Sequence, residues 1–526
     1  MGITVLFLDE KVNSVIHEFI PAGRANHYMS SLKAGSIVKI DRFEVVRALT
    51  LPKKQLESLS VSSLVRKKIS TPRSPPTFPV IGNLHQLGRY PHRSLCSLSY
   101  RYGPRMLLHF GRVPVLVVSS ADAAQDVLKT HDRVFASRPR SKIFRKLHYD
   151  GREVGLAPYG EYWRQMKSVC VLHLLSNKMV RSFRDVRKEE IRIVMENIRK
   201  SNSSRINLSK LLASLTNDVI CRVAFGKKYG GDTDFMELIE RFEKLLGSFS
   251  IGTYVPWLAW LDWISGLDAE VEKTKNDFDE FLERVVQDHV DGGGDKNDFV
   301  HVLLAIQREK SIGFEIDRIS IKAIIMNIFV GGTDTSFTVM EWAMTELLRH
   351  PECLNILQEE VRGICKGKSN VSEEEIQDMK YLKAVIKETM RLHPSLPLLV
   401  PHESTHDVQL RDYYIPTGTQ VMINVWAIGR EAATWGPDAE LFRPEKHLDT
   451  SVDFRGQDFH LIPFGAGRRI CPAISFATVL IELVLANLVH QFDWRSTDDD
   501  QTDVPEAIGI GIRRMFPLYA IASSTT

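Results

Sequence analysis

Helical periodicity dominates this chain after residue 121 and sets the strongest limit on its fold. Apolar residues recur every three or four positions in long stretches, as on the buried face of an amphipathic helix. The longest of these stretches run roughly through 177–200, 268–290, 316–349 and 372–393. Strand-like runs are short, and the clearest is RMLLHFGRVPVLVVSS at 105–120. The pattern predicts a mainly α fold with a small β region.

A proline-rich segment, TPRSPPTFPVIGN at 71–83, marks a domain boundary. Proline fixes its own φ and disfavours helix in the residue before it, so this segment is expected to be stiff and extended. Residues 51–70 are polar and basic and are typical of a linker. Residues 1–50 are rich in β-branched and aromatic residues. We therefore predict a β-like fragment at 1–50, a linker at 51–70 and a catalytic domain at 71–526.

Charge and cysteine usage exclude several classes of protein. The 526 residues carry 68 basic and 65 acidic side chains, a net charge of +3, whereas a protein built to coat nucleic acid needs a clear basic excess. The six cysteines are scattered without a Cys-x-x-Cys pair, which argues against a disulfide framework or a zinc site and favours a reducing compartment. No run of 18 consecutive apolar residues is present, so we expect no membrane anchor in this chain.

The segment FHLIPFGAGRRICPA at 459–473 carries the most chemical information. Gly465 and Gly467 allow a tight backbone path on which N–H groups can point at the sulfur of Cys471. Pro472 is expected at the first position of the helix that follows. A cysteine in an intracellular protein is usually a small buried hydrophobe. At a helix start, however, a thiolate is stabilised, and a single cysteine can serve as the axial ligand of a haem.

The charged neighbours of Cys471 complete a family pattern. Arg468 and Arg469 supply positive charge for anionic groups. FGAGRRICPA resembles the Phe-x-x-Gly-x-Arg-x-Cys-x-Gly loop of the cytochrome P450 superfamily at every fixed position except the last. The resemblance implies a P450 fold in which Cys471 ligates the iron of haem b (iron protoporphyrin IX), Phe464 shields the sulfur and Arg469 binds a haem propionate.

A second motif, FVGGTDTS at 329–336, lies inside a long helical stretch. Gly331 and Gly332 each cost about 1 kcal/mol relative to alanine there, which either a packing notch or the close approach of a flat cofactor would offset. Thr335 can donate a hydrogen bond to the carbonyl of Gly331. Asp334 and Thr335 then form an acid–alcohol pair able to deliver protons through water. The motif resembles the superfamily's Ala/Gly-Gly-x-Asp/Glu-Thr-Thr/Ser pattern, which implies that this helix lines the haem.

A third motif, KETMRLHP at 387–394, places Glu388 and Arg391 on one helix face. Most pairs of this kind are solvated surface charges. The resemblance implies instead that this pair is buried against a later Pro-Glu-Arg segment. This chain has FRPEKH at 442–447, with Lys446 at the expected arginine. Lysine cannot make the bidentate contact of arginine, so we expect a weakened structural triad.

Four other positions bear on the haem. Trp163 and Lys167 share a helix face in PYGEYWRQMK and would ordinarily be core edge and surface, but the resemblance places both over the haem propionates. His402 stands where relatives usually carry a propionate-binding arginine, and histidine is mostly neutral at pH 7. Ala473 adds a methyl group beside the sulfur, which we expect to be tolerated if its φ is negative. With Lys446, these departures predict a loosely held haem.

The resemblance covers about residues 71–523 and is closest to plant microsomal enzymes of the family 71 type, which act on specialised (secondary) metabolites. It implies a haem-thiolate monooxygenase that inserts one oxygen atom from O₂ into a small lipophilic substrate. Electrons would come from NADPH through NADPH–cytochrome P450 reductase. Relatives lie on the cytosolic face of the endoplasmic reticulum membrane. For this chain a cytoplasmic location with weak peripheral contact, aided by the basic residues Arg66, Lys67 and Lys68, is an alternative.

Two other functions stay open on sequence grounds. Some plant relatives carry out a non-oxygenating reaction on the same haem, such as aldoxime dehydration. The chain could also be a catalytically silent haem binder or a chimera. Its first ~45 residues resemble part of a replication-protein-A-type OB-fold domain, but such a fragment is too short to close a five-stranded barrel. Nucleic-acid binding is therefore not expected.

Overall fold

The computed structural model describes residues 70–525, apart from 202, 230–232, 249, 294–296, 311–312, 498–503, 508 and 510, together with four strands before residue 70. The chain divides into two compact units, Met1–Ser70 and Thr71–Thr526. In the first unit, two antiparallel pairs are described: β1 (Ile3–Asp9) with β2 (Ser14–Ile20), and β3 (Lys39–Ile40) with β4 (Phe43–Glu44). The OB-fold fragment and the linker stay predictions, and the basic patch at 66–68 lies outside the described residues.

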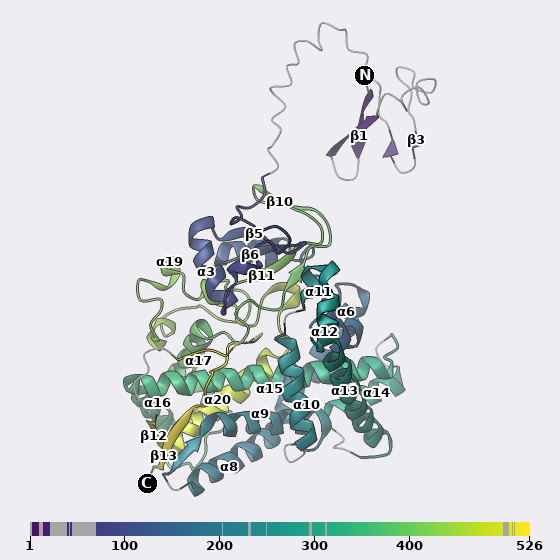
Figure 1. Ribbon diagram of the computed structural model, residues 1–526. Helices are drawn as coiled ribbons and strands as arrows, with labels where there is room; N and C mark the ends of the chain where they lie inside the picture. Colours follow the sequence, from purple (N-terminus) through teal and green to yellow (C-terminus); the bar gives the residue numbers. More distant parts are fainter. Residues whose placement is uncertain are drawn as a thin grey trace. The chain divides into compact units, whose positions relative to one another are not determined.

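The second unit is mainly helical, which confirms the predicted fold class (Figure 1). Its described helices are α3 (Pro91–Tyr102), α4 (Ala121–Gln125), α5 (Lys142–Leu147), α6 (Glu161–Val169), α7 (Asn177–Ser182), α8 (Arg184–Lys200), α9 (Leu208–Phe225), α10 (Thr233–Leu246), α11 (Ile251–Tyr254), α12 (Trp260–Ile264), α13 (Leu267–Val290), α14 (Phe299–Glu309), α15 (Arg318–Arg349), α16 (Pro351–Ile364), α17 (Lys380–Leu392), α18 (Val425–Ile428), α19 (Ala432–Trp435) and α20 (Ile474–Gln491). The four long amphipathic stretches correspond to α7 with α8, α13, α15 and α17. Periodicity alone therefore located these helices, although the stretch at 372–393 begins eight residues before α17 and α9 was not among the stretches singled out.

The β region consists of small sheets at the edges of the helical body (Figure 1). The largest joins β5 (Arg105–Phe110), β6 (Val113–Val118), β11 (Gln420–Ile423) and β8 (His402–Glu403) in that order. The others join β12 (Phe492–Ser496), β13 (Tyr519–Ser524) and β7 (Arg205–Asn207), and β9 (Val408–Leu410) with β10 (Tyr413–Ile415). The β5–β6 hairpin is the predicted strand-like run, and β11 joins it in parallel from a distant part of the chain.

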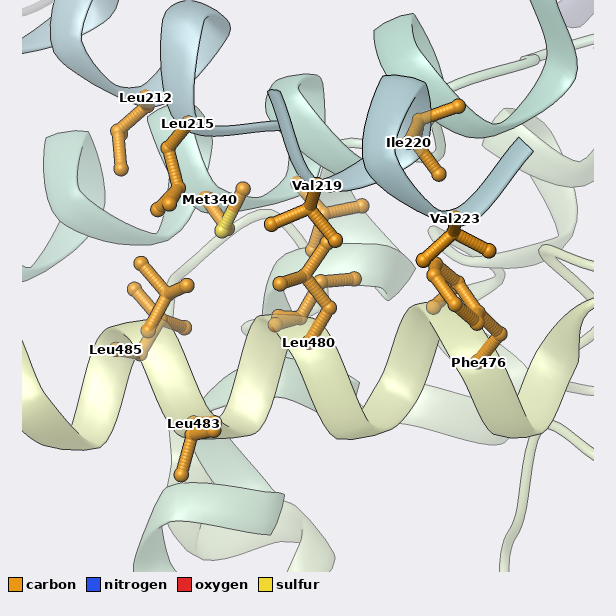
Figure 2. Close-up of a cluster of buried hydrophobic side chains, with 14 of the residues drawn as sticks. Leu212, Leu215, Val219, Ile220, Val223, Met340, Phe476, Leu480, Leu483 and Leu485 are labelled. Atoms are coloured by element: carbon orange, nitrogen blue, oxygen red, sulfur yellow. The ribbon is translucent and has the colours of Figure 1, made fainter. Parts of the chain in front are cut away.

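The core that positions the site lies between α9, α15 and α20. Figure 2 shows apolar side chains of α9 and α20 meeting one another, with Met340 of α15 between them. Leu480 of α20 and Val219 of α9 are fully buried, as is Met340. Truncating side chains that fill a core in this way lowers the free energy of unfolding by several kcal/mol. The three helices therefore form one rigid frame.

Two helices, α15 and α20, are long and apolar enough to cross a membrane by length and composition. In the folded chain, 56% and 67% of their most apolar windows are buried. Both helices therefore behave as core elements.

The side chain of Asp317 caps the start of α15 by accepting a hydrogen bond from the Ser320 N–H at 2.8 Å.

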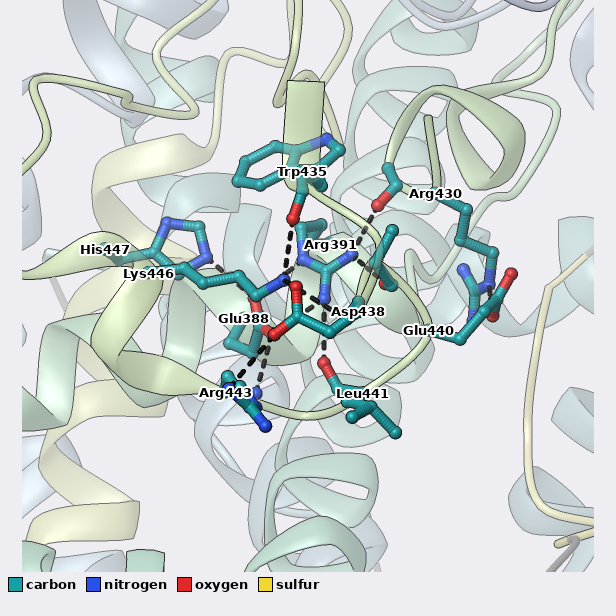
Figure 3. A network of polar contacts seen from close by, with 12 residues as sticks. Glu388, Arg391, Arg430, Trp435, Asp438, Glu440, Leu441, Arg443, Lys446 and His447 are labelled. Atoms are coloured by element: carbon teal, nitrogen blue, oxygen red, sulfur yellow. Dashed lines mark hydrogen bonds and ion pairs between the residues drawn. The ribbon is translucent and has the colours of Figure 1, made fainter. Parts of the chain in front are cut away.

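A buried ion pair within α17, between Glu388 and Arg391, also holds the loops on both sides of α19 (Figure 3). Arg391 donates two hydrogen bonds to Glu388, each at 2.7 Å, and both side chains are fully buried. The remaining guanidinium N–H groups of Arg391 bind the carbonyls of Gly429, Ala439 and Leu441. Burial alone would raise the pKa of Glu388, but hydrogen bonds from Arg391 and His447 hold it at about 2. The carboxylate therefore stays ionised, as this network requires.

The expected role of Lys446 in this network is wrong. Its ammonium group binds the Trp435 carbonyl at 2.7 Å and the Asp438 carboxylate at 2.8 Å (Figure 3). The next residue, His447, contacts Glu388 instead, at 2.9 Å. The short 3₁₀ turn Pro444–His447 directs the two neighbouring side chains to different partners. The Glu388 carboxylate therefore has its hydrogen-bond partners even though position 446 carries lysine and not arginine.

Candidate functional site

Cys471 lies in a tight loop directly before α20. Gly465 and Gly467 both adopt positive φ, +70° and +65°, and a Cβ on Gly467 would stand 2.0 Å from the Leu128 carbonyl oxygen. The Cys471 N–H donates to the Phe464 carbonyl at 3.0 Å and closes the loop. The expected tight path is therefore present, and it depends on glycine at both positions.

The helix after the cysteine begins later than expected. It starts at Ile474 with Ala473 as the N-cap, so Pro472 precedes the cap and is not the first helical residue. Ala473 has φ −96°, the condition under which its methyl group is tolerated. Burial raises the pKa of the Cys471 thiol, and the Ala473 N–H and the Lys167 ammonium act against that rise. Coordination to a metal ion would remove the proton outright.

The sulfur borders a cavity of about 270 Å³. Most of the residues that line it are apolar and come from α15, the loop around 395–402 and the cysteine loop, and Phe464 is one of them. At its polar end lie Arg138, Lys167, His402 and Arg469. Over the described part of the chain, no group of three or more His, Cys, Asp or Glu side chains could hold a metal ion. Cys471 is thus suited to a metal that brings its other ligands with it.

Trp163 anchors the cationic end of the cavity. Its indole N–H donates to the Val154 carbonyl at 3.0 Å, and the Arg469 guanidinium lies 4.3 Å and the Lys167 ammonium 5.2 Å from its ring centre. Arg469 donates to the carbonyls of Ala136, Val154 and Ala157. Lys167 binds two carbonyls of the cysteine loop. Burial lowers the pKa of Arg469 and of Lys167 to about 8 each.

Arg138 is a cavity residue to which the sequence analysis gave no role. It is buried and donates to the Gly155 carbonyl at 2.9 Å and to the Val400 carbonyl at 2.6 Å. His402 donates from Nδ1 to the Phe135 carbonyl at 2.8 Å. Burial and the nearby Arg138 hold the pKa of His402 well below its usual range. His402 is therefore neutral, and Arg138 supplies the second guanidinium.

The polar end of the cavity fits a cofactor with two carboxylates. Arg138, Arg469 and Lys167 gather three positive charges there. Among the described groups that act on these cations, Glu153 is the one carboxyl that offsets the cost of burying them. Buried cations without enough counter-charge are costly, and anionic groups would relieve that cost. The two propionates of haem would match this need, and Cys471, which borders the same cavity, offers a sulfur ligand for its iron. The residues present therefore fit a haem.

The adjacent glycines of α15 serve different purposes. A Cβ on Gly332 would stand 2.9 Å from Ile220 Cδ1, so this residue is a packing notch against α9. A Cβ on Gly331 would meet nothing within 4 Å, and the bare backbone there borders the cavity. Thr335 lines the cavity and donates to the Gly331 carbonyl at 2.7 Å, as the sequence predicted. This side-chain contact does not interrupt the helix, since α15 runs unbroken from Arg318 to Arg349.

Asp334 does not face the cavity with Thr335. Its carboxylate forms an ion pair with Arg513, which also binds Glu243 of α10 at 2.8 Å. Burial raises the pKa of Asp334, and Arg513 opposes that rise. Consecutive residues on a helix point about 100° apart, so the expected side-by-side pair is not formed. A proton on Asp334 would have to reach Thr335 around the helix.

Glu153, a second residue missed by sequence reasoning, is fully buried behind the cavity wall. It accepts a hydrogen bond from the Gly155 N–H and so stabilises the turn 153–157, whose carbonyls bind both buried arginines. Burial raises its pKa to about 7, against the opposing effects of backbone N–H groups and of Arg138 and Arg469. It is a carboxyl that titrates within the physiological range.

Glu153→Gln is expected to flatten the pH dependence of folding stability. The folded pKa is about 7 and the ordinary value is 4.5, so between these values the folded chain binds more protons than the unfolded chain. Stability therefore falls as pH rises from 4.5 to 7, by on the order of 3 kcal/mol for this group. Urea titrations at several pH values measure the slope. The exposed Glu161→Gln control should keep the wild-type slope, and an unchanged slope in Glu153→Gln would contradict the assignment.

Comparison with known proteins agrees with this geometry. The cytochrome P450 family model matches residues 72–515. The chain is 76% identical over 463 residues to "Cytochrome P450 71A26" of Arabidopsis thaliana, covering 88% of this chain and 95% of the relative. It is 52% identical over 466 residues to the "Indoleacetaldoxime dehydratase" of the same plant, covering 87% and 94%. A zebra fish cytochrome P450 structure with abiraterone superimposes with a TM-score of 0.70 at 23% identity, covering 83% and 99%.

Proposed function

The chain belongs to the cytochrome P450 family and is a haem-thiolate monooxygenase, and on that premise we propose which residues perform the reaction and which molecules it accepts. The observation that carries the proposal is that Cys471 borders a mainly apolar cavity. A cluster of buried cations lies at one end of the same cavity. Electrons come from NADPH through a reductase, and O₂ is the second substrate. We propose NADPH–cytochrome P450 reductase as that partner.

Seven side chains would hold the cofactor or support those that do. Cys471 would ligate its iron through the thiolate, and Phe464 would keep water from the sulfur. Arg138, Lys167 and Arg469 would bind the propionates, since their N–H groups lie at the polar end of the cavity. Trp163 would hold Lys167 and Arg469 against its ring. His402 would contribute packing and an unprotonated Nε2, because its one N–H already binds the Phe135 carbonyl. Gly331 leaves the room that a flat ring needs.

When bound, a thiolate-ligated haem supplies activation of O₂ and favours cleavage of the O–O bond. The chain's own task is to exclude bulk water and to hold protons. The Thr335 hydroxyl lines the cavity and donates a hydrogen bond to the Gly331 carbonyl. By rotating away from that carbonyl, it can pass a proton to a cavity water. Asp334 would resupply that proton from the outer side of α15 when its ion pair with Arg513 opens.

Thr335→Val is expected to lower product formed per NADPH consumed at least about tenfold, because the cavity loses its proton-holding hydroxyl. Thr333→Val is the matched control. The Thr333 hydroxyl also donates four residues back, to the Phe329 carbonyl at 2.9 Å, so both variants lose the same helix contact. Product and NADPH are measured in parallel with reductase present. Equal losses in the two variants would sink the role of Thr335.

Dehydration of an aldoxime is the second candidate, because a relative at 52% identity carries the name indoleacetaldoxime dehydratase. The two reactions differ in their need for O₂. Monooxygenation consumes O₂ and places one of its atoms in the product, whereas dehydration proceeds without it. Product formation under ¹⁸O₂ and under argon separates them. An ¹⁸O-labelled product supports the monooxygenase, and an unlabelled product formed equally under argon supports the dehydratase.

We also propose that this chain contacts a membrane through an exposed apolar patch, the α11–α12 patch. Exposed apolar side chains gather on two neighbouring segments: Phe78, Val80 and Ile81 before β5, and Trp257, Trp260, Trp263 and Ile264 at α11–α12. The segments are joined through the β5–β6 turn, where Gly111 N–H donates to the Ile81 carbonyl and Arg112 N–H to the Tyr254 carbonyl. Tryptophan and a nearby arginine are typical of proteins that lie in a lipid interface.

Changing Trp260 and Trp263 together to serine is expected to weaken binding to phosphatidylcholine vesicles at least about tenfold, because two indoles that would insert into the lipid are lost. Their exposed fractions are 53% and 73%, so folding should not suffer. The control changes Leu172 and Leu441, exposed on other segments, to serine. Co-sedimentation measures the bound fraction. Equal binding by both doubly substituted proteins would contradict the α11–α12 patch.

A further inference from the structure

Asn327 is a polar side chain on the cavity-facing side of α15. It stands four residues before Gly331 and eight before Thr335, and a spacing of four keeps residues on one helix face. All three line the cavity. Asn327 is half-buried, and its amide makes no hydrogen bond to any residue that the structure describes. A polar amide on a mainly apolar wall needs a partner, because leaving it dry and unpaired is costly.

The Glu153 carboxyl and this amide both lie beside the bare α-carbon of Gly155, and no hydrogen bond joins them in the part of the chain that the structure describes. The point where a Cβ of residue 155 would stand is 3.1 Å from Asn327 Nδ2, 3.0 Å from Glu153 Oε2 and 3.4 Å from Glu153 Oε1. Oε2 accepts from the Gly155 N–H. Oε1 is buried and has no hydrogen-bond partner within the described ranges. Both groups therefore lie beside Gly155, which lines the cavity, Asn327 at the wall and Glu153 behind it.

The carboxyl decides which end of the amide faces the cavity. Above its pKa of about 7 the Glu153 carboxylate only accepts hydrogen bonds, so it attracts the amide nitrogen, and Nδ2 is the amide atom found beside Gly155. The amide oxygen of Asn327 is left for the cavity, where it can only accept. A substrate that satisfies this oxygen has to carry a donor. A molecule of the same shape without a donor would bury the oxygen unpaired.

We propose that Asn327 is a specificity-determining residue that selects lipophilic substrates carrying a hydroxyl or N–H donor, and that Glu153 positions its amide. This proposal deepens the proposed function and rests on it for the site of binding. It predicts that the molecule enters with its apolar body along the walls of α15 and the loop at 396–400 and with its donor at Asn327. Gly155 is needed because any side chain there would enter the space between the two groups.

Matched ligand pairs test the selection. Phenol, 4-phenylphenol and 2-naphthol are each compared with their own methyl ether, which keeps the shape and loses the donor. Equilibrium dialysis with the holoprotein gives the dissociation constants. In the wild type at least one phenol should bind about three- to tenfold more tightly than its ether. Asn327→Leu should bring that ratio close to one, and Glu153→Gln should reduce it, because a glutamine amide can also donate and no longer fixes the orientation of Asn327.

Ile328→Val is the matched control, since Ile328 is an apolar neighbour that also lines the cavity; it should keep the wild-type ratio. The inference is overturned if no phenol is preferred by the wild type or if the preference survives in Asn327→Leu. Full preference in Glu153→Gln overturns the positioning role. The carbon monoxide spectrum of each sample is recorded separately, so a failure of haem-thiolate ligation is distinguished from a failure of selection, which dialysis reports by itself.

Discussion

Cys471→Ala is expected to abolish monooxygenation and to remove the red-shifted carbon monoxide band of thiolate-ligated haem. The sulfur is the one donor that can reach an iron in the cavity from the cysteine loop, and without it the electron donation that favours O–O cleavage is lost. Loss of a hydrogen-bond partner to a metal ligand already costs up to about a hundredfold. Loss of the ligand itself should therefore cost at least about a hundredfold in product formation.

Cys170→Ala is the control for removing a thiol. Cys170 is a buried cysteine at the end of α6, in the same helical segment as Trp163 and Lys167. It should retain the band and the product. Activity that survives in Cys471→Ala, or that is lost equally in Cys170→Ala, would contradict the assigned ligand. Haem content is measured beside activity, since the cationic end of the cavity can still retain haem through its propionates.

Arg391→Leu is expected to destabilise the catalytic domain by about 3–5 kcal/mol, because it leaves the Glu388 carboxylate buried and unpaired. Three loop carbonyls lose their donors at the same time. A domain is stable by only about 5–15 kcal/mol, so the variant should unfold at much lower urea concentration or fail to accumulate. The predicted loss is large because both partners are fully buried.

Arg192→Leu provides the comparison for this prediction. Arg192 pairs with Glu196 on α8, but the two side chains are 53% and 41% exposed. Exposed pairs are worth under about 1 kcal/mol. Urea unfolding of both variants gives the difference. A loss from Arg391→Leu as small as that from Arg192→Leu would show that the buried network is not essential to the fold.

Local motifs made the centre of the site predictable. The cysteine loop, the Gly331–Thr335 contact and the Glu388–Arg391 pair each depend on residues within a few positions of one another. Their geometry follows from turn and helix rules that apply to short segments. Helix periodicity likewise located four of the long helical stretches, because burial of one face is visible in the spacing of apolar residues.

Contacts between distant segments could not be predicted from the sequence. Arg138 and Glu153 join the site because the carbonyls of the turn at 153–157 accept hydrogen bonds from Arg138 and Arg469, an arrangement that no local spacing indicates. Lys446 and His447 are neighbours, and only the turn that contains them decides which one meets Glu388. Asp334 turns to Arg513 because the C-terminal segment passes beside α15. In each case tertiary packing selected the partner.

The carbon monoxide difference spectrum of the reduced, purified 526-residue chain tests the central claim most directly. We expect a Soret band at the strongly red-shifted position of thiolate-ligated haem, with haem retained through gel filtration. Retention is expected in spite of the neutral His402, because Arg138 supplies the second guanidinium. A band at the unshifted position of haem with a neutral ligand, or a chain that elutes without haem, would contradict the account.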